Sequence, residues 1–198
     1  PIIIGFDGCE VNNKKLDPKC TSVFNCSIYD EYKKNVKKEV LKIIPYVKFV
    51  ELEERGCLSS LLNKCMENVD TEFVNVMQQD LPIIKSFNAQ KIIDIMKENN
   101  DMDMVRYVRD TNNFHENWTK KRCSKIFEPK TIMRNNTIFT QCSQWSDNNH
   151  IAKIDHYKNI VWPNTQPYSF MEHQLVCYPI NNNYDKIWYL GEKMDGYY

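Results

Sequence analysis

Apolar residues in the first 110 positions alternate between short continuous runs and a one-sided helical spacing. The continuous runs predict strands at 1–6, 47–52, 72–78 and 104–109. The helical spacing predicts helices at 30–44, 56–68 and 87–99. Pro45 ends the first helix, and Ser86 is a suitable N-cap for the third. Regular alternation of strand and helix is typical of an α/β fold with a mainly parallel sheet flanked by helices.

The pattern is looser from residue 111 to residue 198. Here we expect strands at 137–142 and 187–191, and helices at 148–160 and 168–178. No repeat and no linker rich in Pro, Gly or Ser divides the chain, so we expect one domain over 1–198, with a regular half at 1–110 and a less regular half at 111–198. Because the first strand starts at Pro1, without a Met, we also expect the domain to belong to a longer chain.

Charge and hydropathy exclude several classes of protein. The 198 residues include 26 basic and 26 acidic side chains, so no broad basic face for nucleic acid is expected. The longest apolar runs, such as Ile2–Ile4, fall far short of the ~20 residues that span a bilayer. We therefore expect a soluble α/β domain without a transmembrane segment or a nucleic-acid partner, and a monomer.

The eight cysteines do not form a recognisable metal or redox motif. No pair has the C-x-x-C spacing of a zinc ribbon or a redox dithiol. A chain of this length can bury a core without staples, so we expect reduced, structural thiols and a cytoplasmic location. Three N-glycosylation sequons, at Asn25, Asn117 and Asn135, favour the opposite interpretation. They carry little weight because sequons arise by chance in an Asn-rich chain.

Two acidic residues follow predicted strands. Asp7 comes after the first strand and Asp80 after the third, and open α/β sheets bind ligands beyond the carboxyl ends of their strands. A lone carboxylate there can hold a divalent metal whose other ligands are phosphate oxygens and water. Between them, Arg55 and Gly56 open a predicted helix, where a phosphate or a nucleotide base could bind. The alternative is that these residues form turns and caps only.

The order of these segments resembles that of GT-A glycosyltransferases of the family-two kind. FDGCE (6–10) and the segment 51–80 resemble the half that binds the nucleotide sugar: a strand that ends in Asp-Gly, a helix led by Gly with a later Asn, and a strand before a metal site. The chain also resembles the glycosyltransferase domains at the N-termini of multidomain chlorella-virus proteins. One departure is that the D-x-D position of the family reads Gln78-Gln79-Asp80.

The resemblance implies a Rossmann-like GT-A fold and a hexosyltransferase that uses a nucleotide sugar, a UDP-sugar in particular, with a glycan or glycoprotein as acceptor. It implies Mn²⁺ or Mg²⁺ at Asp80 as the cofactor. For a viral protein, the cytoplasm would be that of the host. The residues that it assigns to the nucleotide sugar are Asp7, Gly8, Arg55, Gly56, Asn63, Gln79 and Asp80.

Two later segments, 145–157 and 168–175, resemble the acceptor side of the same enzymes. The resemblance makes Glu172 the catalytic base, with His173 beside it, and assigns the acceptor to Trp145, Asp147 and His150. The apolar neighbours of Glu172 in YSFMEHQLVCY predict a raised pKa for its carboxyl, which suits a base near neutrality. Alternatively, Glu172 only stabilises a first helical turn, and the histidines and Trp145 are core residues.

Two other functions stay open at this stage. A nucleotidyltransferase also combines an α/β sheet with an acidic metal site, but it needs two carboxylates and a glycine-rich phosphate loop, and neither is visible here. A non-catalytic carbohydrate-binding module on a transferase-like fold would account for Gln78 and Gln79 at the metal position.

Overall fold

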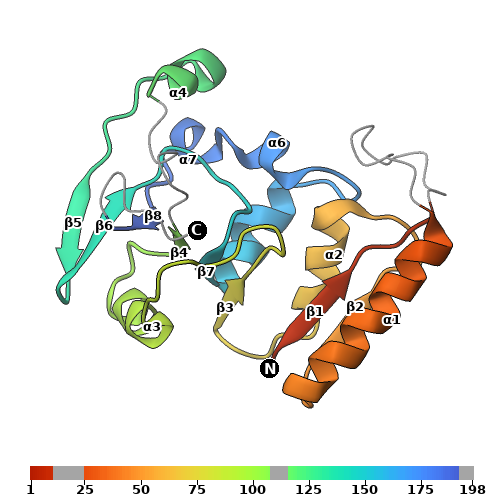
Figure 1. Ribbon diagram of the computed structural model, residues 1–198. Helices are drawn as coiled ribbons and strands as arrows, with labels where there is room; N and C mark the ends of the chain where they lie inside the picture. The colour runs from red at the N-terminus through yellow and green to blue at the C-terminus, as the bar shows by residue number, and fades with distance from the viewer. Residues whose placement is uncertain (11–24, 108–115, 192–198) are drawn as a thin grey trace. The chain divides into compact units, whose positions relative to one another are not determined.

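The computed structural model describes residues 1–10, 25–107 and 116–191, and no side chains for 116–119. The described chain forms two compact units. Unit 1 comprises Pro1–Asp70 and Thr165–Met171, and unit 2 comprises Thr71–Asn164 and Glu172–Tyr198. Figure 1 labels all the strands and most of the helices of both units.

Unit 1 is a β-α-β-α arrangement. Strands β1 (Ile3–Phe6) and β2 (Lys48–Glu51) pair in parallel, with Ile3 opposite Lys48 and Phe6 opposite Glu51. Helix α1 (Cys26–Ile43) connects them, and helix α2 (Cys57–Met66) follows β2. The elements agree with the predicted strand–helix alternation, and in this unit the strands are parallel as predicted.

Helix α1 begins four residues earlier than the sequence pattern predicts. Asn25 is its N-cap, because the side-chain oxygen accepts hydrogen bonds from the backbone N–H groups of Ser27 and Ile28. On the helix surface, Lys33 and Lys37 both form ion pairs with Glu51 of β2. No residue of α1 is buried. The two ion pairs are therefore partly exposed to solvent and stabilise the packing of α1 against β2 only modestly.

Serine hydroxyls on α2 fix the later segment of unit 1. Ser59 Oγ accepts a hydrogen bond from the backbone N–H of Ser169, and Ser60 Oγ accepts one from Tyr168, each at 3.0 Å. Ser59 is buried, so a lost bond there would leave a polar group without compensation. Each bond joins residues more than 100 positions apart in the chain. Together they explain why segment 165–171 belongs to unit 1.

Unit 2 is built on a six-stranded sheet in the order β3-β7-β4-β8-β6-β5. Only β4 and β8 are parallel neighbours, and all other neighbouring pairs are antiparallel. Its strands are β3 (Phe73–Val76), β4 (Met104–Tyr107), β5 (Thr131–Arg134), β6 (Thr137–Gln141), β7 (His150–Lys153) and β8 (Ile187–Leu190). Its helices are α3 (Ala89–Glu98), α4 (Glu116–Cys123), α5 (Ile154–His156), η2 (Tyr157–Val161), η3 (Trp162–Asn164) and α7 (Tyr178–Asn181), and α6 (Met171–Leu175) begins at the unit boundary.

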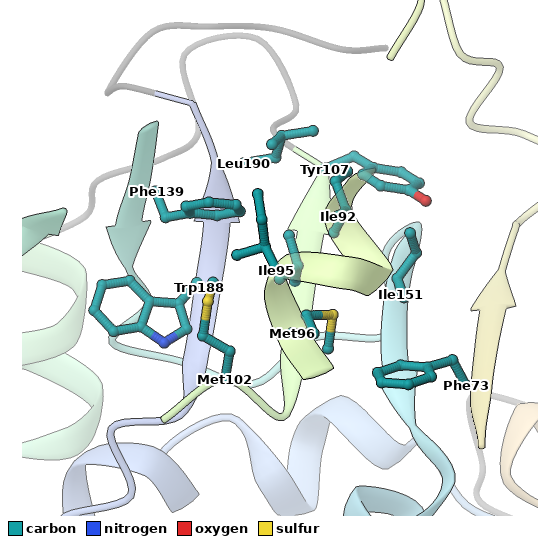
Figure 2. Close-up of a cluster of buried hydrophobic side chains, with 11 residues drawn as sticks. Phe73, Ile92, Ile95, Met96, Met102, Tyr107, Phe139, Ile151, Trp188 and Leu190 are labelled. Carbon is teal, nitrogen blue, oxygen red and sulfur yellow. The ribbon is translucent and has the colours of Figure 1, made fainter. Parts of the chain in front are cut away.

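One face of this sheet carries the apolar core. Helix α3 lies across it and directs Ile92, Ile95 and Met96 toward the strands (Figure 2). Side chains from five strands and from the α3–β4 connection complete the core: Phe73, Met102, Val105, Tyr107, Phe139, Ile151, Trp188 and Leu190. Strand residues alternate between faces, so their neighbours along each strand lie on the opposite face. That second face includes Arg106, His150 and Tyr189, all buried.

The prediction of a mainly parallel sheet is wrong for unit 2. Strands β3 and β4 do run in the same direction, because both are antiparallel to β7. However, β7 lies between them, at a place where the sequence pattern predicted the helix 148–160. The segment His150–Lys153 is buried on both faces and too short to show a period, so its apolar residues suit a helix or a strand equally.

Other boundaries also differ from the predictions. The helix predicted at 168–178 is two short helices, α6 and α7, and the strand β5 was not predicted. The N-cap of α3 is Asn88 rather than Ser86, since the Asn88 side chain accepts the N–H of Lys91 at 3.0 Å. The predicted strand 104–109 extends to Tyr107, and residues 108 and 109 lie outside the described part of the chain.

The prediction of reduced thiols is wrong. Disulfides join Cys9 to Cys26 and Cys123 to Cys177, and Cys57 is disulfide-bonded as well. Among the described cysteines, Cys65 and Cys142 are free. Sequence spacing did not reveal the bonds, because each joins segments that only the fold brings together. The expectation of a cytoplasmic location therefore loses the observation on which it rested.

The lengths and compositions of the described helices bear on whether this chain can cross a bilayer. None of those in residues 1–10, 25–107 and 116–191 is both long and apolar enough to cross a membrane.

Candidate functional site

The residues singled out from the sequence fall into two groups, one in each unit. Unit 1 holds Asp7, Gly8, Arg55, Gly56 and Asn63, whereas unit 2 holds Gln79, Asp80, Trp145, Asp147, His150, Glu172 and His173. The second group contains the richer set of mutual contacts.

In unit 1, Asp7 joins two chain segments. Its Oδ1 accepts hydrogen bonds from the backbone N–H of Gly8 at 2.9 Å and of Gly56 at 2.8 Å. Gly56 is the N-cap residue of α2, so a carboxylate already occupies a favourable position at the start of that helix. This bond assigns Asp7 a structural role, and its predicted contact with a nucleotide stays a prediction.

Both glycines of this region are required by close packing. A Cβ on Gly8 would lie 2.1 Å from the carbonyl carbon of Glu54, and one on Gly56 would lie 2.6 Å from Leu52 Cδ1. The backbone beside them is fixed by the Arg55 N–H, which donates to the Glu10 carbonyl at 2.8 Å. Gly8 is therefore explained by the approach of the Glu54 backbone, and Gly56 by crowding from the nearby side chains of Leu52 and Ser60, without a ligand.

Two other predicted nucleotide contacts in this unit differ in exposure. Arg55 is half-buried and lies near Tyr29. Burial and the charge of Asp7 raise the pKa of the Tyr29 phenol, and the positive charge of Arg55 opposes them only slightly. Asn63 is exposed on α2. The structure thus leaves Asn63 accessible and places Arg55 partly inside the unit.

In unit 2, the loop after β3 is held against the loop before β7. The backbone N–H of Gln78 donates to Asn149 Oδ1 at 2.7 Å, and Asn149 Nδ2 donates to the Leu81 carbonyl at 2.6 Å. Gln78 Nε2 also donates to the carbonyl of Asp147 at 3.2 Å. Gln79 and Asp80 lie at the tip of this fixed loop with exposed side chains. A carboxylate is thus presented to solvent on a rigid support.

The loop before β7 carries one member of a pair of carboxyl groups. Asp147, which is 9% exposed, interacts with Glu172 at the start of α6, and the two side chains are hydrogen-bonded. Burial and the adjacent Glu172 raise the pKa of Asp147 to about 7. Ser146 Oγ donates a further hydrogen bond to Glu172. Near neutrality, the pair can therefore hold one proton and release it.

A buried cation faces the same region. Arg106 of β4 is 3% exposed and donates to the Gln144 carbonyl at 3.2 Å and to Tyr189 Oη at 3.1 Å. Its charge lowers the pKa of Asp147, although burial and Glu172 outweigh it. Arg106 also lies over the Tyr189 ring, 4.9 Å from the centroid. It gives the pair a fixed positive neighbour.

His150 and Trp145 are buried residues of this network. His150 Nε2 lies 2.6 Å from Tyr157 Oη, and its Nδ1 lies 2.6 Å from the Asn148 carbonyl. Burial lowers the pKa of His150 to about 3, so the ring is neutral. Trp145 donates its indole N–H to His156 Nε2 at 3.2 Å, and burial lowers the pKa of His156 to about 4.

These contacts bear on the predicted roles. Full burial of Trp145 and His150 disfavours direct contact with an acceptor sugar, and both support the loop that carries Asp147. His173 is exposed on α6, next to Glu172. Glu172 itself is half-buried, so its side chain keeps some contact with solvent, and its predicted role as a base stays a prediction.

Several of the residues that surround the Asp147–Glu172 pair were not predicted from the sequence. Sequence reasoning gave Glu172 no ionisable neighbour except His173, whereas Asp147 lies beside it in the fold. It also passed over Arg106, although an arginine within the apolar run MVRYVR was a usable signal. Ser146, Asn149 and Tyr157 gave no signal, because short polar residues and tyrosines occur throughout the loops.

The predicted metal site at Asp80 depends on which side chains could bind a divalent cation there. Among the described residues, no three His, Cys, Asp or Glu side chains form a group that could hold a metal. A single carboxylate still fits a cation that arrives with a diphosphate, since phosphate oxygens and water then supply the remaining ligands. Asp80 is exposed, and its predicted role as a metal ligand stays a prediction.

Comparisons with known proteins were made on both sequence and fold. No protein-family model, no curated protein and no solved structure matches the chain.

Proposed function

We propose that this chain is a glycosyltransferase that moves a hexose from a nucleoside-diphosphate sugar, a UDP-sugar in particular, to a glycan or glycoprotein acceptor. One observation carries the proposal: a carboxyl pair that can exchange a proton near neutrality is fixed to the loop that presents Asp80. The Gln78–Asp147 and Gln78–Asn149 hydrogen bonds supply the connection. The order of segments that resembles GT-A enzymes supplies the donor class.

In the proposed reaction, Glu172 is the general base. The hydroxyl oxygen of the acceptor forms a bond to the anomeric carbon, while the bond between that carbon and the diphosphate oxygen breaks. The hydroxyl proton passes to the Glu172 carboxylate. A protonated Asp147 supports this step, because it donates its hydrogen bond to Glu172 and holds the side chain in place. Ser146 Oγ donates a further hydrogen bond to the same carboxylate.

Asp80 would hold Mn²⁺ or Mg²⁺ together with the diphosphate. The cation would supply neutralisation of the leaving diphosphate. The contribution of this chain is the loop itself: two of its backbone groups are hydrogen-bonded to Asn149, and its tip exposes Gln79 and Asp80. Gln79, exposed next to Asp80, is proposed as a further contact of the phosphates.

The unit 1 residues retain a proposed role in nucleotide binding. Asp7, Gly8, Arg55, Gly56 and Asn63 occupy the positions that the resemblance assigns to the base, the ribose and the phosphates. Asp7 already accepts two backbone hydrogen bonds through Oδ1, so a contact with a nucleotide would use its other oxygen. The roles of Gly8 and Gly56 would be indirect, through the shape of the backbone.

The proposal is tested by UDP binding and by turnover of a panel of UDP-sugars, each with and without Mn²⁺. The variant Glu172→Gln should lower turnover by roughly 10²–10⁴-fold, the usual effect of losing a general base, with UDP affinity nearly unchanged. Asp80→Asn should abolish the dependence of UDP affinity on Mn²⁺. Asp94→Asn removes an exposed carboxylate of α3 in the same unit and should change neither quantity.

Each alternative has its own outcome. Turnover of Glu172→Gln within a few-fold of the parent would show that the base lies elsewhere, with Asp147 and His173 next. Sugar binding without any effect of UDP or Mn²⁺ would indicate a carbohydrate-binding module. Release of pyrophosphate from a nucleoside triphosphate would indicate a nucleotidyltransferase.

A further inference from the structure

The three N-glycosylation sequons occupy different structural settings. Asn25 is the N-cap of α1, and its Oδ1 accepts hydrogen bonds from the N–H and the hydroxyl of Ser27, the third residue of the same sequon. The middle residue, Cys26, is held in a disulfide. The side chain of Asn117 lies outside the described residues. The Asn25 sequon is therefore engaged in local structure.

Asn135 has the opposite setting. It forms the two-residue turn of the β5–β6 hairpin together with Asn136, and both have positive φ, 45° and 56°. This is the conformation of a type I′ turn, which Asn tolerates well. Both side chains are exposed. Within the described part of the chain, Asn135 Nδ2 donates one hydrogen bond, to exposed Glu98 at 3.3 Å. A group attached to Nδ2 would therefore start from an exposed side chain.

The disulfides indicate the cellular compartment. Bonds between Cys9 and Cys26 and between Cys123 and Cys177 form and persist in oxidising compartments. In eukaryotic cells, the compartment that oxidises thiols also attaches glycans to sequons in surface loops. Disulfides and an exposed sequon are independent features of the chain, and both point to this environment.

We propose that Asn135 is an N-glycosylation site and that the chain folds in the lumen of the secretory pathway. In the modification, Nδ2 of Asn135 forms a bond to the anomeric carbon of an oligosaccharide carried on a lipid diphosphate. The bond between the sugar and the diphosphate breaks, the amide nitrogen loses one proton, and the lipid diphosphate leaves. Thr137, which begins β6, completes the sequon.

The position also suits a protective role for the glycan. Strand β5 is at the end of the sheet order, and among the strands of the described residues it pairs with β6 alone. It exposes Met133, which is 63% accessible. Unpaired edge strands with exposed apolar residues can pair with other chains. A glycan at the turn would cover this end of the edge strand and hinder such association.

The test is secretion of the full chain from eukaryotic cells behind a cleavable leader, followed by peptide mapping. Enzymatic removal of N-glycans should lower the mass of the chain and convert Asn135 to Asp in its peptide. Thr137→Ala should lose the glycan at this position, whereas Thr137→Ser, which keeps the sequon, should retain it. Asn136→Gly also keeps the sequon and suits the positive φ, so it should retain the glycan.

The parent protein gives the decisive measurement, because it needs no variant to fold. An unmodified Asn135 peptide in the secreted parent, or a glycan that persists in Thr137→Ala, would overturn the proposal. Asn25→Asp keeps the cap acceptor of α1 but removes the Asn25 sequon, and it should leave the modification of Asn135 unchanged. The proposed compartment is tested on the protein in the cells that naturally make it. It would be contradicted if the four cysteines of the two disulfides all react there as thiols: Cys9, Cys26, Cys123 and Cys177.

Discussion

The carboxylate of Asp7 accepts a hydrogen bond from the backbone N–H of Gly56 at 2.8 Å, although the residues are 49 positions apart in the chain. The bond joins the end of β1 to the start of α2 and also involves the N–H of Gly8. A residue that resembles a nucleotide contact in the sequence thus has a role in the fold itself. Its two possible roles can be separated by experiment.

We expect Asp7→Ala to lower the free energy of unfolding by about 1–3 kcal/mol, because two backbone N–H groups lose their acceptor. Asp7→Asn keeps an acceptor oxygen and should lose less than half of that. Urea unfolding measures both values. If Asp7→Asn leaves the free energy of unfolding intact but weakens UDP binding tenfold or more, Asp7 also contacts the nucleotide. If Asp7→Ala is as stable as the parent, Asp7 has no structural role.

The raised pKa of Asp147 predicts a pH-dependent gain in stability for Asp147→Asn. The folded protein favours the protonated acid, with a pKa of about 7 compared with 3.8 in the unfolded chain. Between these values, the folded state binds more protons, so the contribution of Asp147 to stability falls as pH rises and is fully lost above about 7. The variant, which cannot ionise, avoids this loss.

The advantage of Asp147→Asn over the parent should therefore grow from near zero at pH 4 to about 2–4 kcal/mol at pH 8. Urea unfolding of both proteins across this range measures it, and the effects of the buried histidines cancel in the difference. Asp94→Asn, at an exposed site, should show no such trend. A difference that is constant with pH would mean that Asp147 ionises normally in the folded protein.

The contact between His150 and Tyr157 predicts a cost for loss of one hydroxyl. Tyr157→Phe removes the Oη that lies 2.6 Å from His150 Nε2 and leaves a buried ring nitrogen without that partner. We expect a loss of about 1–3 kcal/mol in thermal or urea unfolding. Tyr32→Phe, on a side chain that is 51% exposed, should cost less than about 0.5 kcal/mol. Equal costs would show that the His150 contact contributes nothing specific.

The disulfides predict two different losses of stability. The Cys123–Cys177 bond closes a longer loop than Cys9–Cys26, with separations of 54 and 17 residues. The chain-entropy relation gives about 4 kcal/mol for the first bond and about 3 kcal/mol for the second. Paired Cys→Ala variants measure each loss. The reverse order of the two losses would show that strain or residual structure in the unfolded chain outweighs loop length.

The free thiols give a complementary prediction. Burial raises the pKa of Cys65 to about 11 and that of Cys142 to about 12, so few thiolates exist near neutral pH. We expect both to resist alkylation in the native protein at pH 8 and to react once the chain is denatured without reductant. Mass mapping identifies the labelled residues. Rapid native labelling of Cys142 would contradict its burial.

The sequence predicted most elements of the fold, and it failed where pairing was distant. The apolar runs at β1, β2, β3, β4, β6 and β8 were found because each is a local pattern. The order of the strands was not, since β7 enters between β3 and β4 from more than 40 residues away. A strand of four residues buried on both faces has no period that would distinguish it from a helix.

The candidate site shows the same division. The residue types were visible in the sequence: Asp80 after a strand, Asp147 in a polar loop and Glu172 before an apolar turn. Their positions along the chain carry no information about distance in space. The pairing of Asp147 with Glu172, and the bonds from Gln78 that fix the Asp80 loop beside them, depend on contacts between residues 25 to 71 positions apart.

What the sequence determined by itself is therefore the local structure: which segments are apolar, which residues can cap or break a helix, and which carry chemistry. These properties follow from backbone geometry and side-chain type within a few residues. The tertiary structure alone decided the antiparallel insertion of β7, the cysteine pairs and the raised pKa of Asp147. Each of these depends on burial and on distances between remote segments, which are set only when the whole unit packs.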